Sequence, residues 1–250
     1  MWFYQKMFLF SISKKGNLKG NDIGINLTTS ILIDLIKSGL IELLGERWNI
    51  ICIKKSPPQT QYPEMTIIHR IMLDWLKQLE SLLPLSRVLK IFSSRLDPHQ
   101  DLFLSILSEF THNALIKVDN SRRIFGPLYN ITPKGLKNDK DPAKRELIED
   151  ISLILSYRQY LNYYQKKNRS DELYKGIFHD APLSGDLPVN MLYNILFLAI
   201  LFQGRLSKRV YRKDITYSQR KTLKRIIKKF YPAKMLRRSM SRAWDLKYKS

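Results

Sequence analysis

The side chains best suited to catalysis are scattered along this sequence. The four histidines are His69, His99, His112 and His179. They show no metal-ligand spacing such as H-E-x-x-H, and the chain has no phosphate-binding glycine loop, G-x-S-x-G motif or dinucleotide fingerprint. Glu149 and Asp150 are neighbours, which on a helix point to different faces. We therefore expect no enzyme, no metal site, no cofactor and no small-molecule substrate.

Positive charge is the chemical property that stands out. The 250 residues contain 43 lysines and arginines against 22 acidic residues, a net charge of +21. The segment 205–250 alone holds 17 of these cations and two acidic residues, Asp214 and Asp245, so +15 of the charge lies there. A charge of this size predicts a polyanionic partner, which is a membrane surface, RNA or DNA.

Within this segment one amphipathic helix carries much of the charge. Leu223, Ile226, Ile227 and Phe230 recur at i, i+3, i+4 and i+7. The cations on the other faces are Lys221, Lys224, Arg225, Lys228 and Lys229. Such a helix suits an anionic membrane interface, which we expect these cations to face. Alternatively, the apolar side packs on the core and only the charges are exposed, which still leaves a cationic surface.

A capped apolar helix followed by a hairpin is expected at the centre of the fold. Leucines and isoleucines from Leu27 to Ile36 form one broad apolar face, with Asn21 and Asp22 as caps and Gly39 as the terminator. Two β-rich runs follow, Leu40–Leu44 and Asn49–Lys54, joined by a polar turn at residues 45–47.

Helical periodicity dominates the rest of the chain. We expect helices at about residues 3–12, 65–83, 86–94, 97–118, 141–164, 189–202 and around 223–230, and a second hairpin at 119–133. Asp97 and Pro98 are read as the cap and the first-turn residue of the helix at 97–118. The apolar run 189–202 is shorter than the roughly 20 residues that span a bilayer, so a core helix is expected. Pro232 should end the basic helix, leaving 233–250 as a loose basic extension.

The N-terminus and the cysteine content indicate a cytoplasmic protein. MWFYQKMFLF lacks a basic leader and a small-residue cleavage site, so we interpret it as a first helix, not a signal peptide. The single Cys52 excludes a disulfide framework and a cysteine-based zinc site, and fits a reducing compartment.

The order of several segments resembles a known family. The pieces are KMFLFSI, NLKGND, ILIDLIKSGLIEL, IICIKKSPPQT, HNALIKVDNSRRIF, DPAKRELIEDI and the apolar run 189–202. Together they resemble the Golgi phosphoprotein family, peripheral adaptors that recognise phosphatidylinositol 4-phosphate. The resemblance covers roughly residues 4–232 and implies a mainly α fold: a central apolar helical bundle ringed by amphipathic helices and loops, with a protruding β-hairpin. We therefore expect one helical domain at 1–232 and a basic extension at 233–250.

The resemblance also implies a headgroup-binding site. In this sequence the site is degenerate, because other residues stand at the family's ligand positions. The family's tryptophan falls in a gap near Lys19, Thr28 stands at its first arginine, and Ser105 and Ser108 stand at its later arginine pair. The cations that could replace them are Lys14, Lys15, Lys19, Arg122 and Arg123. Self-association in the family uses the hairpin, which here carries Leu44, Trp48 and Ile50.

Three functions remain open from the sequence. The first is a non-enzymatic, peripherally membrane-associated protein that binds anionic, phosphoinositide-type lipid. The second is a winged-helix-like nucleic-acid binder, although Thr28, Thr29 and Ser30 offer no long polar side chain to read bases. The third is an assembly scaffold that uses Trp48 at the hairpin tip as a buried anchor.

Overall fold

The protein is mainly helical, with two small antiparallel hairpins, as the sequence predicts. The computed structural model describes residues 1–13, 15–19, 22–44, 49–52, 65–79, 83–97, 100–119, 128–131, 142–157, 189–211 and 213–249. The described helices are α1 (Phe3–Ser11), α2 (Ile23–Lys37), α3 (Ile67–Gln78), α4 (Leu85–Arg95), α5 (Asp101–His112), α6 (Pro142–Ser156), α9 (Val189–Gln203), α10 (Ser207–Val210), α11 (Tyr217–Lys229) and α12 (Tyr231–Tyr248). The strands are β1 (Ile41–Leu44), β2 (Asn49–Cys52), β3 (Ile116–Asp119) and β4 (Leu128–Ile131).

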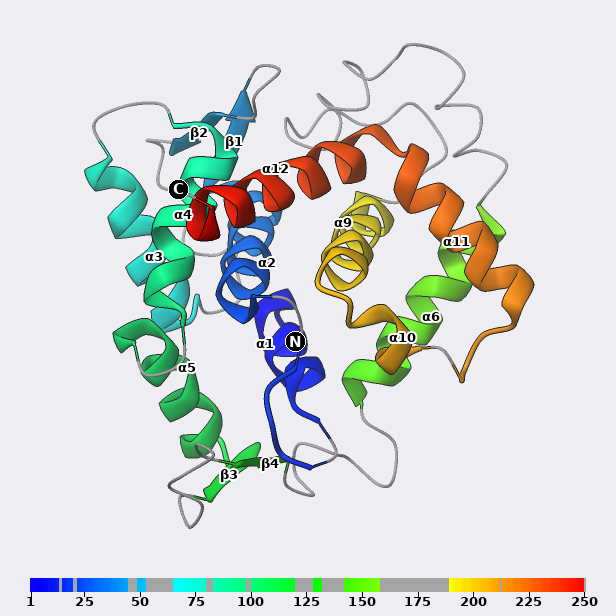
Figure 1. The fold of residues 1–250 in the computed structure, drawn as a ribbon, viewed down its shortest axis with the longest axis horizontal. Coiled ribbons are helices and arrows are strands. Elements are labelled where there is room, and N and C mark those ends of the chain that lie inside the picture. Colours follow the sequence, from blue (N-terminus) through cyan, green and yellow to red (C-terminus); the bar gives the residue numbers. More distant parts are fainter. Residues whose placement is uncertain are drawn as a thin grey trace.

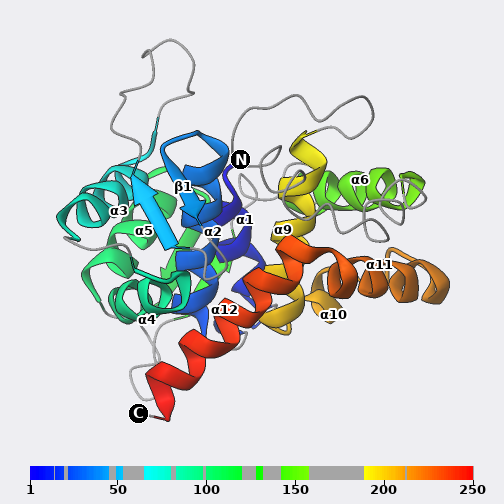
Figure 2. The ribbon, with the colours of Figure 1, turned by 90° about the horizontal axis from the view of Figure 1, so that it is seen from above.

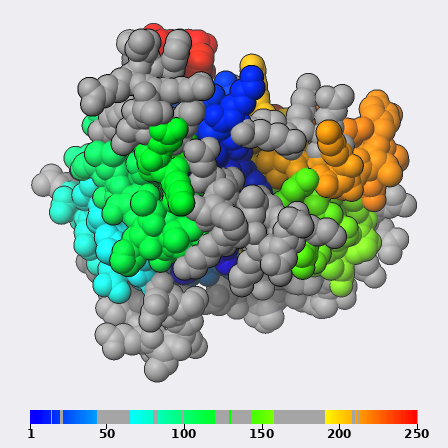
Figure 3. Space-filling model, turned by 90° about the horizontal axis from the view of Figure 1, so that it is seen from below, coloured from blue at the N-terminus to red at the C-terminus, as the bar shows by residue number. Residues whose placement is uncertain are grey.

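Two buried helices, α2 and α9, form the centre of the molecule. They pack against each other, with α1 beside α2, the helices α3–α5 on one flank and α6, α10 and α11 on the other (Figure 1). α12 crosses α9, α2 and α4 and joins the two flanks. Seen from below, the N-terminal residues reach the surface between the flanks (Figure 3). The central apolar bundle that was expected is confirmed.

The start and end of α2 follow from local side-chain chemistry. The Asp22 carboxylate accepts the amide hydrogen of Ile25 at 2.8 Å, which satisfies an amide that has no partner within the helix. Gly39 has a φ of 66°, the left-handed conformation that ends a helix without a Cβ clash. Asn21, the other expected cap, lies outside the described residues.

The apolar helix α9 behaves as a core element. Its described side chains from Met191 to Leu201 are buried, apart from the half-buried Asn194. Phe197 stacks on Phe3 of α1 with ring centroids 4.9 Å apart. None of the described helices has both the length and the apolar character needed to cross a bilayer.

Several predicted boundaries are wrong. α3 ends at Gln78, short of the expected residue 83. α5 begins at Asp101, so Asp97 is not its cap; the Asp97 carboxylate binds Lys247 instead. α5 ends at His112 because Ala114 turns into the left-handed region, with a φ of 55°, and Ile116–Asp119 then pairs with β4. The second hairpin is confirmed, but it starts earlier than expected.

The largest correction concerns the extension expected at 233–250: its described residues, 233–249, do not form a loose segment. Residues 231–248 are the helix α12, and Pro232 lies in its first turn, where the missing amide hydrogen would have no helical partner anyway. Phe230 has an extended backbone and separates α11 from α12. The helix buries Pro232, Ala233, Leu236, Met240 and Ala243 against the core. Pro232, which was expected to end the basic helix, therefore lies in the first turn of the next helix, α12.

Candidate anion-binding groove

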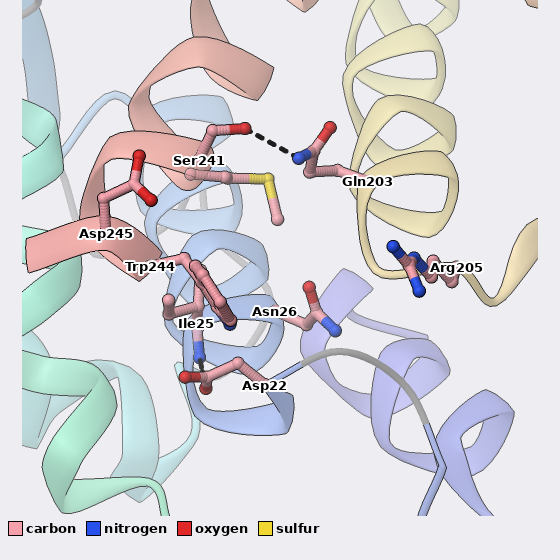
Figure 4. A pocket seen from close by; sticks show the side chains of 9 residues that line it. Asp22, Ile25, Asn26, Gln203, Arg205, Ser241, Trp244 and Asp245 are labelled. Carbon is pink, nitrogen blue, oxygen red and sulfur yellow. Dashed lines mark hydrogen bonds between the residues drawn. The ribbon is translucent and has the colours of Figure 1, made fainter. Parts of the chain in front are cut away.

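A groove runs along one side of α12, between this helix, the start of α2, the last turn of α9 and the end of α11. It consists of two adjoining hollows of about 260 Å³ and about 520 Å³, which share Gln203, Ser241 and Asp245. The smaller hollow is also lined by Asp22, Ile25, Asn26, Arg205, Met240 and Trp244 (Figure 4). The larger one is also lined by Lys228, Lys234, Arg237, Arg238 and Arg242. Sequence reasoning identified only Lys228 of this lining as a site residue.

Local sequence signals place α11 and α12 around the groove. Thr216 and Gln219 form a capping box at the start of α11, each side chain accepting from the other's backbone amide. Leu223, Ile226, Ile227 and Phe230 are buried, so the apolar side of α11 packs on the core, the alternative left open from the sequence. A short extended link at Phe230 then brings Lys228 and Lys234 to the same hollow.

Three hydrogen bonds to acidic residues fix the C-terminal end of α12. Lys247 Nζ lies 2.7 Å from Asp97 Oδ1 and 3.2 Å from Asp22 Oδ2, and the Tyr248 hydroxyl donates to Asp22 Oδ2 at 2.7 Å. Burial alone would lower the pKa of Lys247, but hydrogen bonds and attraction from Asp97 and Asp22 outweigh it and raise the pKa above its usual value. α12 is thereby tied to the N-terminus of α2 and the end of α4.

The larger hollow is strongly cationic. None of its five lysines and arginines pairs with a carboxylate among the described residues. The one carboxylate in its lining, Asp245, lies 2.6 Å from Lys249 Nζ. Like charges held close together without counterions favour a bound anion, because an anion relieves their mutual repulsion.

Among these cations, Arg237 is the one with a buried side-chain nitrogen that lacks a hydrogen-bond partner among the described residues. This nitrogen is Nε, and the guanidinium lies 4.9 Å from the centre of the Phe202 ring. Burial lowers the pKa of Arg237 below its usual value. An anion in the hollow would supply the missing charge and acceptor, and the guanidinium group is suited to binding phosphate or carboxylate.

The second cationic surface is the outer side of α11. Lys221, Lys224, Arg225, Lys228 and Lys229 are all exposed, and none pairs with a carboxylate among the described residues. Lys221, Lys224 and Lys228 follow one line along the helix, at i, i+3 and i+7. α11 leads directly into α12 (Figure 2). Because Lys228 also lines the groove, the exposed side of α11 and the cations of α12 form one basic face.

The residues of the expected family pocket are not brought together in the part of the chain that the structure describes. Thr28 is 0% exposed, and its Oγ1 lacks a hydrogen-bond partner among the described residues. Ser105 donates to the Asp101 carbonyl of its own helix, and Ser108 is exposed on α5. α4 contacts both α2 and α5, and α5 lies below α4 in the view of Figure 1.

The lysines of this expected pocket lie elsewhere or outside the described residues. Lys15 and Lys19 are exposed beside the second hairpin, where the Tyr129 amide donates to the Gly16 carbonyl at 2.8 Å. Lys14, Arg122 and Arg123 fall outside the described residues, and so does Trp48 of the first hairpin. Leu44 and Ile50 lie in β1 and β2, where Leu43 opposes Ile50 and Leu44 opposes Asn49.

The expected absence of a catalytic cluster stays a prediction. The described residues contain no group of three or more histidine, cysteine and acidic side chains that could hold a metal ion. His69 is buried beside Asp34 with Nε2 3.6 Å from Asp34 Oδ2, and His112 is exposed at the end of α5. His99 and His179 lie outside the described residues.

Asp150 gives a prediction on stability and pH. Asn194 donates to Asp150 Oδ1 at 2.7 Å, and burial, only partly opposed by Lys6, raises the pKa of Asp150 from 3.8 to about 6. A raised pKa means that the folded state binds the proton more tightly, so this contribution to stability is full below about pH 4 and is lost as pH rises through about 6.

Asp150→Asn should therefore stabilise the protein at neutral pH by about 1 kcal/mol, a value discounted for partial exposure. The new amide oxygen can still accept from Asn194. Urea unfolding at about pH 4 and about pH 7.5 should show a larger gain at the higher pH. Asp74→Asn, at an exposed position on α3, is the control and should change either value by less than about 0.5 kcal/mol. Equal pH profiles for wild type and Asp150→Asn would contradict the assignment.

Sequence reasoning missed most of the groove, although one signal for α12 was present. The buried residues at 232, 233, 236, 240 and 243 follow helical spacing beyond the proline. The contributions of Gln203 and Arg205 depend on how α9 meets α12, which no local pattern reveals.

In comparisons with known proteins, no protein-family model and no curated protein matches this chain.

Proposed function

We propose that this is a non-enzymatic peripheral membrane protein that binds anionic lipid through the basic face of α11 and α12. The observation that carries the proposal is the set of exposed cations on these helices that lack carboxylate partners among the described residues. The apolar side of α11 is buried, so attachment would be electrostatic at this helix and would not need it to enter the bilayer.

The number of cations suits reversible attachment. Each lysine or arginine close to an anionic leaflet contributes about 1 kcal/mol, and the effect fades within a Debye length of about 10 Å. Several cations on one face would hold the protein at a membrane at physiological salt and release it at high salt. The proposed ligand is a phosphoinositide-type headgroup, such as that of phosphatidylinositol 4-phosphate, because phosphate esters match the Arg237–Arg238 end of the groove.

The family resemblance adds two further parts to the proposal. One is an adaptor role at a cytoplasmic membrane surface, as in the Golgi phosphoprotein family. The other is self-association through the first hairpin, with Leu44, Trp48 and Ile50 as contact residues. Mass measurement across a dilution series tests the second part: a single mass at every concentration would remove it.

The nucleic-acid alternative would have to use the same basic face. In a winged-helix arrangement α2 would be the recognition helix, but Thr28, Thr29 and Ser30 are buried and cannot reach a groove of DNA. A duplex could still contact the cations of α11 and α12 through its phosphates, with strong salt dependence. Gel shifts with duplex DNA in the absence of lipid binding would favour this alternative.

Charge reversal on α11 tests the proposal. The variant Lys224→Glu, Arg225→Glu, Lys228→Glu, Lys229→Glu should reduce recovery with anionic vesicles in a flotation assay at least about tenfold, because four attractions become repulsions. Wild type should float with vesicles that contain phosphatidylserine or phosphatidylinositol 4-phosphate and not with pure phosphatidylcholine. Preference for the phosphoinositide over phosphatidylserine at equal charge would support the headgroup assignment.

A matched control reverses four exposed cations elsewhere. Arg70, Arg87, Lys117 and Arg145 lie on α3, α4, β3 and α6, and their replacement by glutamate changes the net charge by the same amount. This control should keep most of the vesicle binding. If both variants lose binding equally, net charge and not the α11–α12 face is responsible. If wild type floats equally with neutral and anionic vesicles, the proposal fails.

A further inference from the structure

A line of side chains along α12 changes from cationic to aromatic. Lys234, Arg237, Ser241, Trp244 and Tyr248 follow one another at i, i+3, i+7, i+10 and i+14, so they lie on the same side of the helix. The first part of this line belongs to the cationic hollow, and Trp244 lines the smaller hollow (Figure 4). The aromatic end of α12 therefore continues the basic face.

The two aromatic side chains at this end are unusually exposed for their size. Trp244 is 41% and Tyr248 is 54% exposed, and their ring centroids lie 5.3 Å apart. Lysines accompany both rings: Lys249 Nζ lies 5.6 Å from the Trp244 ring and Lys247 Nζ lies 5.4 Å from the Tyr248 ring. Tryptophan and tyrosine beside cations are the residues enriched where a membrane meets water, since their rings are apolar and their N–H or O–H groups stay hydrated.

The structure also holds this pair in a fixed position. Lys247 binds both Asp22 and Asp97, and the Tyr248 hydroxyl donates to Asp22, so the last turn of α12 is tied to α2 and α4. An anchor that is already ordered loses little conformational entropy on binding. The Trp244 ring packs near Tyr248 and also lines the smaller hollow.

We propose that Trp244, supported by Tyr248, is an aromatic anchor that enters an anionic bilayer as far as the boundary between headgroups and acyl chains. This inference rests on the proposed function and adds a direction to it: the C-terminal end of α12 is the part that inserts, while the cations of α11 and α12 stay at the phosphate level. The bilayer is favoured as the occupant because the anchor is continuous with the cations that would attract its headgroups.

The test measures insertion and affinity separately. Vesicles of phosphatidylcholine and phosphatidylserine with brominated acyl chains quench a tryptophan only when it approaches the chains. Wild type should be quenched more strongly than Trp244→Phe, because the other three tryptophans contribute equally to both. Trp244→Ala should weaken binding to the same vesicles about tenfold, the effect expected if the bilayer buries roughly half of the exposed indole surface. Thermal unfolding of both variants verifies that they are folded.

A control removes an exposed apolar side chain on a different helix, α3. Ile67→Ala on α3, where Ile67 is 69% exposed, should leave vesicle affinity unchanged. If wild type binds vesicles while Trp244→Ala binds equally well and bromine quenching does not depend on Trp244, the anchor is overturned and membrane binding stands. If wild type binds no vesicles, the proposed function fails first. Quenching of Trp244 by single-stranded DNA without vesicle binding would overturn both, since bases can stack on an exposed indole.

Discussion

Asp34→Ala should destabilise the protein by about 3–5 kcal/mol, the largest single effect that the structure predicts. Asp34 is 1% exposed on α2, and its carboxylate accepts the amide hydrogens of Phe3 at 3.0 Å and Tyr4 at 3.1 Å. These two amides lie in the first turn of α1, where they have no partner within the helix. The carboxylate also stabilises the positive end of the α1 dipole.

Alanine would leave these groups buried without partners. The two amides would lose their acceptors, and His69 Nε2, which has no hydrogen bond, would lose the carboxylate 3.6 Å away. An unpaired buried polar group costs about 1–3 kcal/mol, so the two amides together account for the estimate. A displaced α1 would also weaken its contact with α5, because the Tyr4 hydroxyl donates a hydrogen bond to Glu109 of α5 at 2.8 Å.

Urea unfolding measures this effect, with two variants for comparison. Asp34→Asn keeps one acceptor oxygen and should lose about half as much stability, since its amide group faces an N–H donor. Asp74→Ala on α3, where an exposed aspartate pairs with Lys77, should change stability by less than about 0.5 kcal/mol. A loss below about 1 kcal/mol for Asp34→Ala would mean that the α1 amides find other acceptors.

The sequence predicts well those features that depend on neighbouring residues. The cap at Asp22, the left-handed Gly39, the buried side of α11 and the core helix α9 are all set by short-range patterns. The exposed cations of α11 follow from the same pattern, since burying Leu223 and Ile226 leaves the opposite side in solvent.

Thr28, which the family resemblance assigns to a headgroup pocket, is buried. Small polar residues can be buried in a helix if they bond to its own carbonyls: Thr29 Oγ1 donates to Ile25 at 2.6 Å and Ser30 Oγ to Asn26 at 2.9 Å. Their presence in α2 therefore does not mark an exposed side. The groove could not be predicted either, because its two walls come from α9 and α12, 38 residues apart at the Gln203–Ser241 hydrogen bond.

Gly24→Ala should have the second-largest effect, a loss of about 3 kcal/mol. Gly24 lies in the first turn of α2, where this helix crosses α4. A Cβ there would come within 2.3 Å of the Ser93 carbonyl oxygen and 3.0 Å of an Asp97 carboxylate oxygen. The backbone carbonyl cannot rotate away as a side chain can, so the two helices must separate. Because Asp22 and Asp97 flank this contact, the separation should also strain the two bonds that Lys247 makes.

Gly204→Ala is the matched control, since it adds the same methyl group at the end of α9. Its Cβ would meet the Asn26 side chain, at 2.6 Å from Nδ2, instead of backbone atoms. The Asn26 amide can shift by rotating, so the expected loss is about 1 kcal/mol. Denaturant unfolding of both variants gives the loss in free energy of unfolding for the same added methyl group, placed against a backbone oxygen in Gly24→Ala and against a side chain in Gly204→Ala. Equal losses would mean that α2 and α4 can move apart freely, and the end of α12 would then be anchored less firmly than its salt bridges indicate.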